Sequence, residues 1–206
     1  VSGYDRTKGS ITDKLKDKGI QVIFKDSIEA IPEKFKLKGT KVIYTPAIPN
    51  DNIQLNYFMN NGFEVRKRSY LLGKLTKDSK LFAVAGTHGK TTTSTILSHM
   101  CNSIQLKFTA FLGGIANGFN SNLISNGNEF SIVEADEYDR SFLELNPTIS
   151  CITSMDSDHL DIYKNKANLV KAFKEFSKKT QKHLLVAKGL PIKGNTFSLN
   201  QKADYY

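Results

Sequence analysis

Short apolar runs alternate with amphipathic segments through the N-terminal part of the chain. The runs are rich in Val, Ile, Tyr and Phe, which favours β-strands. Between them, apolar side chains recur every three or four residues, as on one face of a helix. We predict strands at residues 20–24, 41–45 and 63–65 and helices at 10–19, 52–61 and 69–76, with residues 1–5 resembling the end of another strand.

The predicted helices have plausible ends. Ser10 and Ser69 precede periodic segments and are candidate N-caps, because a hydroxyl can accept a hydrogen bond from the first turn. Gly19 and Gly62 follow the last periodic positions, where a glycine commonly ends a helix.

A polar break at residues 77–80 is followed by longer apolar runs. Residues 81–85 are continuously apolar, as expected of a central strand that is buried on both faces. Because strands alternate with helices, we predict an α/β fold with parallel sheets, divided into domains at 1–78 and 79–206. Further strands are predicted at 108–112, 130–134, 150–153 and 183–186, and helices at 90–101 and 165–179, the latter with Leu169, Phe173 and Phe176 on one face.

Composition narrows the class of protein. Of the 206 residues, 39% are hydrophobic, which is enough for a substantial core, and no apolar run is long enough to span a membrane. Two cysteines cannot form a disulfide framework, so a cytoplasmic location is the simplest expectation. The net charge of +9 reflects lysines spread along the sequence, which favours a solvated surface. Binding of a polyanionic small molecule is the alternative, and a nucleic-acid site is disfavoured.

The string Gly86-Thr87-His88-Gly89-Lys90-Thr91-Thr92 follows the strand predicted at 81–85. Glycines let backbone N–H groups approach phosphate oxygens, and the helix that follows directs its positive end at the anion. Lys90 could reach the terminal phosphates of ATP, and the Thr91 hydroxyl could bind Mg²⁺. Val84 stands where the general phosphate-binding loop has its first glycine.

Two acidic strings follow other predicted strands. Glu134 opens Glu-Ala-Asp-Glu-Tyr-Asp, and His159 lies in residues 156–161, Asp-Ser-Asp-His-Leu-Asp. Carboxylates at the carboxyl end of a strand lie where α/β sheets bind ligands, and Mg²⁺ prefers oxygen ligands. An isolated acidic loop is more often a solvated turn, and a histidine among acids is either a metal ligand or a charge-stabilised surface residue.

Taken together, these strings resemble the Mur ligases, a family of ATP-dependent amide-forming enzymes of peptidoglycan synthesis. The resemblance covers nearly the whole chain, and in this family the first glycine of the general loop is normally absent. It implies a Rossmann-like domain followed by a P-loop NTPase-type domain with a parallel sheet. The matching strings are 85–93, Phe111-Leu-Gly-Gly-Ile115, 133–142, 158–161 and Tyr44-Thr-Pro-Ala-Ile-Pro49.

The resemblance also implies roles for the matched positions. Residues 86–92 would hold the ATP phosphates, with Lys90 on the γ-phosphate. Thr91 and Glu134 would hold one Mg²⁺ and His159 would help to hold a second, which makes Lys90, Glu134 and His159 the expected catalytic residues. Phe111–Ile115 would approach the sugar-lactyl end of the substrate, although its two glycines could equally form a tight turn. In the first domain we expect contacts to the UDP part from Asp5, Thr45, Pro46, Ala47 and Ile48, all of which could instead be ordinary strand-end and turn residues.

The implied reaction joins L-alanine to UDP-N-acetylmuramate at the expense of ATP. The lactyl carboxylate attacks the γ-phosphorus, and the amine of alanine then attacks the resulting acyl phosphate. Family members have a strand and a glycine-rich turn before the segment matched by Val1, and they continue beyond the segment matched by Tyr206. We therefore expect this chain to be a piece that does not complete the ligation alone.

Three other readings stay open. A recycling ligase that adds a tripeptide to the same nucleotide sugar shares the main strings, although residues 140–147 run on without an insertion, which favours the alanine reaction. Folylpolyglutamate synthetase shares the architecture but usually lacks a histidine at the position of His88. A nucleotide-binding module without catalysis is the third alternative.

Overall fold

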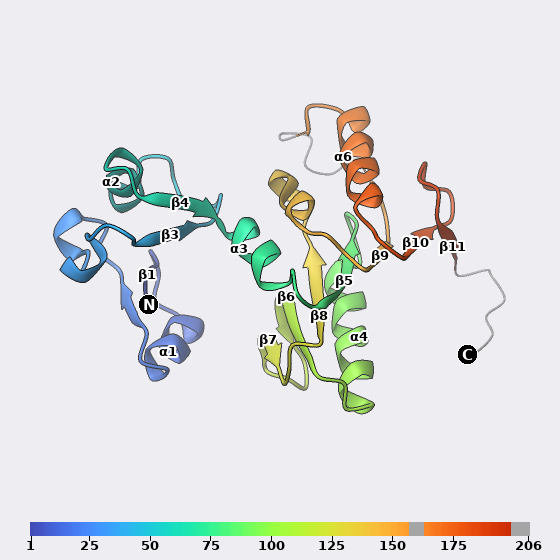
Figure 1. The fold of residues 1–206 in the computed structure, drawn as a ribbon, viewed down its shortest axis with the longest axis horizontal. Helices are drawn as coiled ribbons and strands as arrows, with labels where there is room; N and C mark the ends of the chain where they lie inside the picture. The colour runs from blue at the N-terminus through green and yellow to red at the C-terminus, as the bar shows by residue number, and fades with distance from the viewer. Residues whose placement is uncertain (157–162, 199–206) are drawn as a thin grey trace. The chain divides into compact units, whose positions relative to one another are not determined.

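The structure is a computed structural model, which describes residues 1–156 and 163–198 (Figure 1). The chain forms two compact units, Val1–Leu71 and Leu72–Tyr206. The division falls inside a helix, α3 (Arg68–Leu75), whereas the sequence pattern suggested a boundary after residue 78. Within the described residues, no helix combines the length and apolar character needed to cross a bilayer.

The first unit contains two pairs of parallel strands. β1 pairs with β2, and β3 pairs with β4, and each pair is connected through a chain segment that includes an α-helix. This strand–helix–strand order is the one predicted, and α2 carries its cap at Asn52, whose side chain accepts a hydrogen bond from Leu55 N at 2.8 Å. The elements are β1 (Ser2–Tyr4), α1 (Ser10–Asp17), β2 (Gln21–Ile23), η1 (Ile28–Ala30), η2 (Glu33–Phe35), β3 (Lys41–Tyr44), α2 (Ile53–Asn60) and β4 (Glu64–Lys67).

Two predicted caps are wrong. The N-cap of α1 is Gly9, because Thr12 Oγ1 bonds both the N–H and the carbonyl of Gly9, at 2.9 and 2.7 Å. Ser69 is buried inside the first turn of α3, which follows β4 without a loop and begins at Arg68.

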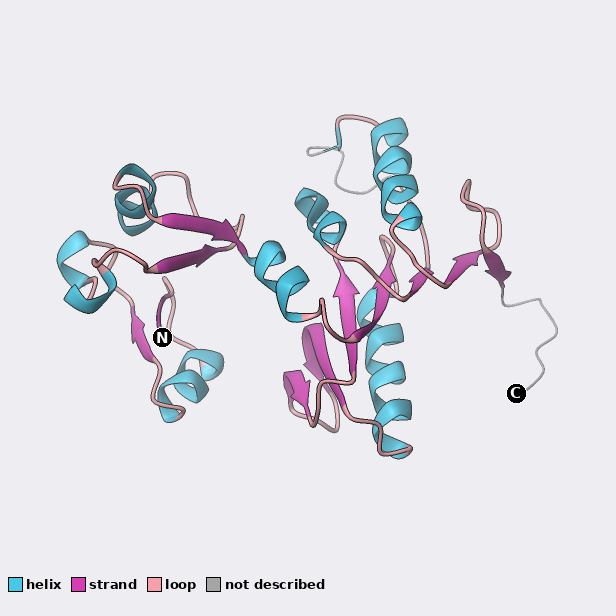
Figure 2. Cartoon of the chain, viewed as in Figure 1, coloured by secondary structure: helices cyan, strands magenta, loops and turns pink. Residues whose placement is uncertain are grey.

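The second unit is built on a seven-stranded sheet in the order β11-β10-β9-β5-β8-β6-β7. Figure 2 shows the strands in magenta and the helices in cyan. All neighbours run parallel except β7, which pairs antiparallel with β6. The sequence pattern predicted neither β7 nor β11. The strands are β5 (Lys80–Ala85), β6 (Phe108–Ala116), β7 (Ser121–Ser125), β8 (Phe130–Ala135), β9 (Ile149–Ile152), β10 (His183–Ala187) and β11 (Asn195–Phe197).

Helical segments cover both faces of this sheet. Successive side chains of a strand point to opposite faces, so Leu81 of β5 lies in one core cluster and Phe82 packs against another. The first cluster includes residues of η3 (Tyr138–Glu144) and α6 (Lys166–Lys178), and the second includes residues of α4 (Lys90–Ser103). This explains why β5 is apolar at nearly every position. Its carboxyl end is held between the strands on either side, β8 and β9.

Candidate functional site

A glycine-containing loop connects β5 to α4 at the carboxyl end of the central strand. Gly86 and Gly89 adopt positive φ angles of 139° and 81°, a region that side-chain-bearing residues rarely occupy. A Cβ on Gly86 would collide with the Thr153 hydroxyl. Gly89 is the N-cap of α4, so the N-terminal end of this helix, which carries a partial positive charge, directly follows the loop.

The residues that follow β9 hold the loop in place. Ser154 accepts hydrogen bonds from the backbone of Thr87 through its carbonyl, at 3.3 Å, and of His88 through its hydroxyl, at 2.7 Å. Thr153 Oγ1 donates to the carbonyl of His88 at 2.5 Å, and Thr87 Oγ1 accepts from Asp156 N at 2.9 Å. The sequence pattern predicted this strand but not its contacts with the loop, because hydroxyl residues after a strand have many uses.

Lys90 is the first residue of α4, and its ammonium group makes three hydrogen bonds. Its Nζ donates to the carbonyl of Gly86 at 2.7 Å and to the two carboxylate oxygens of Glu137 at 3.1 and 2.8 Å. The side chain of Lys90 is 13% exposed and that of Glu137 is fully buried. Glu137 was not among the predicted site residues, although it lies in the same acidic string as Glu134.

Thr91 and Glu134, the two residues expected to bind one cation, lie within hydrogen-bonding distance of each other. Thr91 Oγ1 donates to Glu134 Oε1 at 2.8 Å, and the N–H of Gly113 donates to Glu134 Oε2 at 2.7 Å. A hydroxyl beside a carboxylate provides the hard oxygen donors that Mg²⁺ prefers, so the residues fit this ion. Gly113 and Gly114 lie within β6, where the register against β7 shifts, and do not form a tight turn.

The segment after Glu137 is fixed by its backbone and by Tyr163. The carbonyl of Glu137 accepts hydrogen bonds from the Tyr163 hydroxyl at 2.5 Å and from Arg140 N at 2.9 Å. Burial, with a smaller contribution from the charge of Glu137, raises the pKa of Tyr163 to about 12. Asp139 and Arg140 have positive φ angles of 52° and 57°, which lets the chain turn sharply at this point.

The remaining residues predicted around the loop are more exposed. His88 Nε2 lies 3.6 Å from a carboxylate oxygen of Asp156, and both side chains are 67% exposed. Thr92 occupies the first turn of α4. His159 lies outside the described residues, so its predicted metal role stays a prediction.

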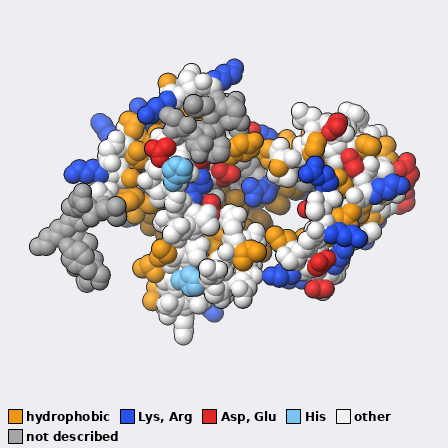
Figure 3. Space-filling view, turned by 180° about the vertical axis from the view of Figure 1, so that it is seen from behind, with side chains coloured by type: hydrophobic (Ala, Val, Ile, Leu, Met, Phe, Trp, Pro, Cys, Tyr) orange, Lys and Arg blue, Asp and Glu red, His pale blue; other side chains and the backbone are white. Residues whose placement is uncertain are grey.

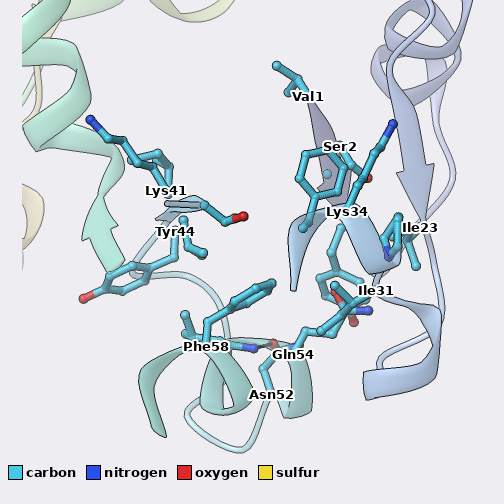
Figure 4. Close-up of a pocket in the computed structure, with 18 of the residues that line it drawn as sticks. Val1, Ser2, Ile23, Ile31, Lys34, Lys41, Tyr44, Asn52, Gln54 and Phe58 are labelled. Atoms are coloured by element: carbon cyan, nitrogen blue, oxygen red, sulfur yellow. Dashed lines mark hydrogen bonds between the residues drawn. The ribbon is translucent and has the colours of Figure 1, made fainter. Parts of the chain in front are cut away.

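The candidates in the first unit form two local turns. Asp5 Oδ1 accepts a hydrogen bond from Thr7 N at 2.8 Å, and Thr45 O accepts one from Ile48 N at 3.1 Å. A cavity of about 690 Å³ lies between β1 and β3 (Figure 4), and Thr45 and Ile48 are part of its wall. Asp5, Pro46 and Ala47 are not among the residues that line it.

Two family descriptions match the chain. "Mur ligase family, catalytic domain" matches residues 1–80, and "Mur ligase middle domain" matches residues 84–190. The second match includes the loop, Glu134, Glu137 and Tyr163.

Curated relatives and solved structures agree with these matches. The chain is 48% identical to the UDP-N-acetylmuramate–L-alanine ligase of Flavobacterium psychrophilum and 47% identical to that of Christiangramia forsetii, in each case over 100% of the chain and 46% of the relative. It therefore spans about half the length of the curated relatives it matches. The UDP-N-acetylmuramate-alanine ligase of Thermotoga maritima has a similar structure, with a TM-score of 0.82, 26% identity and coverage of 98% of this chain and 47% of that one.

A further similar structure is UDP-N-acetylmuramate:L-alanyl-gamma-D-glutamyl-meso-diaminopimelate ligase from Neisseria meningitides. Its TM-score is 0.80 at 20% identity, with coverage of 93% of this chain and 64% of that one. At this identity the likeness concerns the fold, and it supports the expected succession of a Rossmann-like and a P-loop domain.

Proposed function

Because this chain belongs to the Mur ligase family, we propose that it supplies the ATP-binding part of a ligase that joins L-alanine to UDP-N-acetylmuramate. The observation that carries the proposal is the meeting of Lys90 and Thr91, at the start of α4, with the carboxylates of Glu137 and Glu134. The names of the curated relatives supply the choice of L-alanine and of the nucleotide sugar.

In this proposal the loop at residues 86–92 binds the phosphates of ATP. The positive N-terminal end of α4 and the ammonium of Lys90 stabilise the charge that develops when the γ-phosphoryl group moves to the lactyl carboxylate of the substrate. The amine of L-alanine then displaces phosphate from the acyl phosphate, which forms the amide bond. The protein mainly brings together reactants that carry like charges and would otherwise repel.

Thr91 and Glu134 would hold Mg²⁺, with His159 as the proposed ligand of a second ion. The ion would neutralise part of the phosphate charge when bound. Gly113 belongs to this arrangement, because its N–H fixes one oxygen of the Glu134 carboxylate and leaves the other facing Thr91.

We propose that the first domain, at 1–78, binds the UDP part of the substrate and that the second, at 79–206, binds ATP. The turn that contains Thr45 and Ile48 is the better supported of the two predicted substrate segments, since both residues line the cavity of the first unit. Lysines and arginines are interspersed with acidic and apolar side chains on the face shown in Figure 3. That distribution supports a small-molecule substrate over nucleic acid, and a cytoplasmic location fits the proposed substrates.

Binding of Mg²⁺–ATP to the wild-type chain and to Lys90→Ala, measured by isothermal titration, tests the ATP site. We expect clear loss of affinity in the variant, and equal affinity in the two would overturn the phosphate role of Lys90. The same result would favour the alternative of a module without catalysis.

The acceptor is tested in a chimera in which residues 1–206 replace the matching stretch of the Flavobacterium psychrophilum relative. We expect ADP formation that depends on L-alanine and on UDP-N-acetylmuramate. A chimera that works with the tripeptide and not with L-alanine would instead indicate the recycling reaction. The chain alone should release no ADP in response to L-alanine, and full-rate release would contradict its expected incompleteness.

A further inference from the structure

Glu137 holds the ammonium of Lys90 although nothing in the sequence pattern gave it a role. An ammonium group has three N–H donors, and the three hydrogen bonds of Lys90 go to Gly86 O and to both oxygens of Glu137. The lysine that is expected to bind the terminal phosphate is therefore already paired with a carboxylate. An arriving phosphate must take over at least one of these donors.

The carboxylate cannot easily move away from the lysine. Its side chain is fully buried, and a buried carboxylate without a cationic partner is strongly unfavourable. The backbone carbonyl of the same residue is fixed by Tyr163 Oη and Arg140 N. Phe142, which is also buried, donates its N–H to the carbonyl of Asp136 at 2.9 Å and stacks on Phe176 with ring centres 4.9 Å apart. These contacts anchor the segment on both sides of Glu137.

The two glutamates of the acidic string have different partners. Glu134 bonds Thr91 and Gly113, and its side chain belongs to the proposed cation site. Glu137 accepts hydrogen bonds from Lys90 Nζ through both of its carboxylate oxygens. The two glutamates, three residues apart, therefore contact adjacent residues of α4. Glu134 bonds the Thr91 hydroxyl and Glu137 bonds the Lys90 ammonium.

We propose that Glu137 is a positioning residue that competes with the terminal phosphate of ATP for Lys90. This inference rests on the proposed ATP-binding function and deepens it. With the site empty, Glu137 keeps the ammonium against the loop carbonyl of Gly86. When ATP binds, the lysine shares its donors between the carboxylate and the phosphate, so that part of the binding energy is used to loosen an existing ion pair.

The test is a double-mutant cycle with Lys90→Met and Glu137→Gln, read out as the affinity of the chain for two nucleotides with Mg²⁺. The first nucleotide is β,γ-imido-ATP, and the second is AMP, which has no terminal phosphate for Lys90 to reach. Removing the competing carboxylate should tighten β,γ-imido-ATP binding by about ten-fold, because a close charge pair is being replaced by an unopposed cation. AMP affinity should stay unchanged. In the Lys90→Met background, Glu137→Gln should have no effect on either nucleotide.

Controls separate competition from a general loss of structure. Glu144→Gln changes an exposed glutamate at the end of the same segment and should leave both affinities at wild-type values. Glu137→Asp keeps the charge one methylene further from Lys90 and serves if the Gln variant does not fold, with an expected gain that is smaller in size. Thermal unfolding of each variant reports the folded fraction at the titration temperature.

Each outcome decides between the proposals. A loss of affinity for both nucleotides in Glu137→Gln, or equal effects with and without Lys90, would overturn the competition and leave the ATP site standing. Wild-type affinity in Lys90→Met, or no binding of β,γ-imido-ATP by the wild-type chain, would overturn the ATP site itself and with it the role of Glu137.

Discussion

The N–H of Gly113 donates a hydrogen bond of 2.7 Å to the carboxylate of Glu134, and a Cβ on Gly113 would lie 2.7 Å from both oxygens of that carboxylate. The Glu134 carboxylate therefore lies directly against Gly113, so any side chain at position 113 would have to displace it. Gly114 is adjacent but different, because its Cβ would make an ordinary contact of 3.6 Å with Thr91 Cγ2.

This pair of glycines provides a matched substitution. Gly113→Ala should displace the Glu134 carboxylate from Thr91 and weaken Mg²⁺–ATP binding, because the added methyl group needs the space that the carboxylate occupies. Gly114→Ala should change the free energy of unfolding by less than about 1 kcal/mol. Thermal unfolding and Mg²⁺–ATP titration check both, and equal behaviour of the two alanine variants would contradict the close approach.

Glu134→Gln should weaken ATP binding in a way that depends on Mg²⁺. The amide keeps an acceptor for Thr91 Oγ1 but loses the charge that favours a divalent cation. We expect about a ten-fold loss of affinity with Mg²⁺, on the scale of changes around bound metals, and little change when EDTA removes it. Titrations at several Mg²⁺ concentrations measure this, and a loss that persists in EDTA would indicate a general distortion.

The ion pair of Lys90 and Glu137 predicts a compensating pair of substitutions. Lys90→Met leaves the fully buried Glu137 without the cation and should cost about 3–5 kcal/mol of unfolding free energy. Adding Glu137→Gln removes the buried negative charge and should recover much of that loss. Urea unfolding of the four proteins of the cycle gives the coupling, and additive effects would mean that the two side chains do not depend on each other.

Tyr163 predicts a loss of stability at alkaline pH. The pKa of its hydroxyl is raised to about 12 in the folded chain, mainly by burial, whereas an unfolded tyrosine ionises near pH 10. The folded state therefore binds the proton more tightly, so this contribution is complete below about pH 10 and is lost as the pH rises towards about 12. Urea unfolding between pH 9 and 12 should show a decrease that is smaller in Tyr163→Phe, and identical slopes would contradict it. At neutral pH the same variant should cost about 1–2 kcal/mol for the lost bond to the Glu137 carbonyl.

Ser154→Ala tests the clamp on the phosphate loop. The change removes the hydroxyl that accepts from His88 N at 2.7 Å and bonds Thr87 Oγ1 at 2.8 Å, so the loop should lose part of its preorganised shape. We expect a few-fold weaker ATP binding with a stability loss of about 1 kcal/mol. Ser177→Ala, on α6, is the matched control, because its hydroxyl donates to the nearby Lys174 carbonyl within the same helix, at 2.9 Å. An ATP affinity as high as wild type in Ser154→Ala would show that the loop keeps its shape without this serine.

Much of the fold follows from periodicity, since long apolar or amphipathic segments such as β5 and α6 have one consistent reading. β7 and β11 were not predicted, because they lie at the two edges of the sheet and are largely exposed. Their sequences, Ser-Asn-Leu-Ile-Ser and Asn-Thr-Phe, therefore show little apolar pattern. The N-cap at Gly9 was not predicted, because glycine has no side chain that could accept a capping hydrogen bond. Instead, the hydroxyl of Thr12, three residues later, accepts a hydrogen bond from the N–H of Gly9.

The site divides in a similar way. Lys90, Thr91 and Glu134 could be predicted because local motifs place them after buried strands. Glu137 could not be distinguished from the other acids of its string, because its partner, Lys90, lies 47 positions away along the chain. Contacts of this kind depend on packing between elements, which spacing along the chain does not specify.

The two small sheets of the first unit have a consequence for its thermodynamics. Among the described residues, β1 pairs only with β2 and β3 pairs only with β4, while both β1 and β3 border the same cavity. Their remaining backbone donors and acceptors form a template that an extended segment could pair with. Any strand that occupies it binds the folded unit and not the unfolded chain, so the unit's stability becomes a function of that strand's concentration. For this half of the molecule, a melting temperature is then meaningful only together with the identity and the amount of what fills the gap.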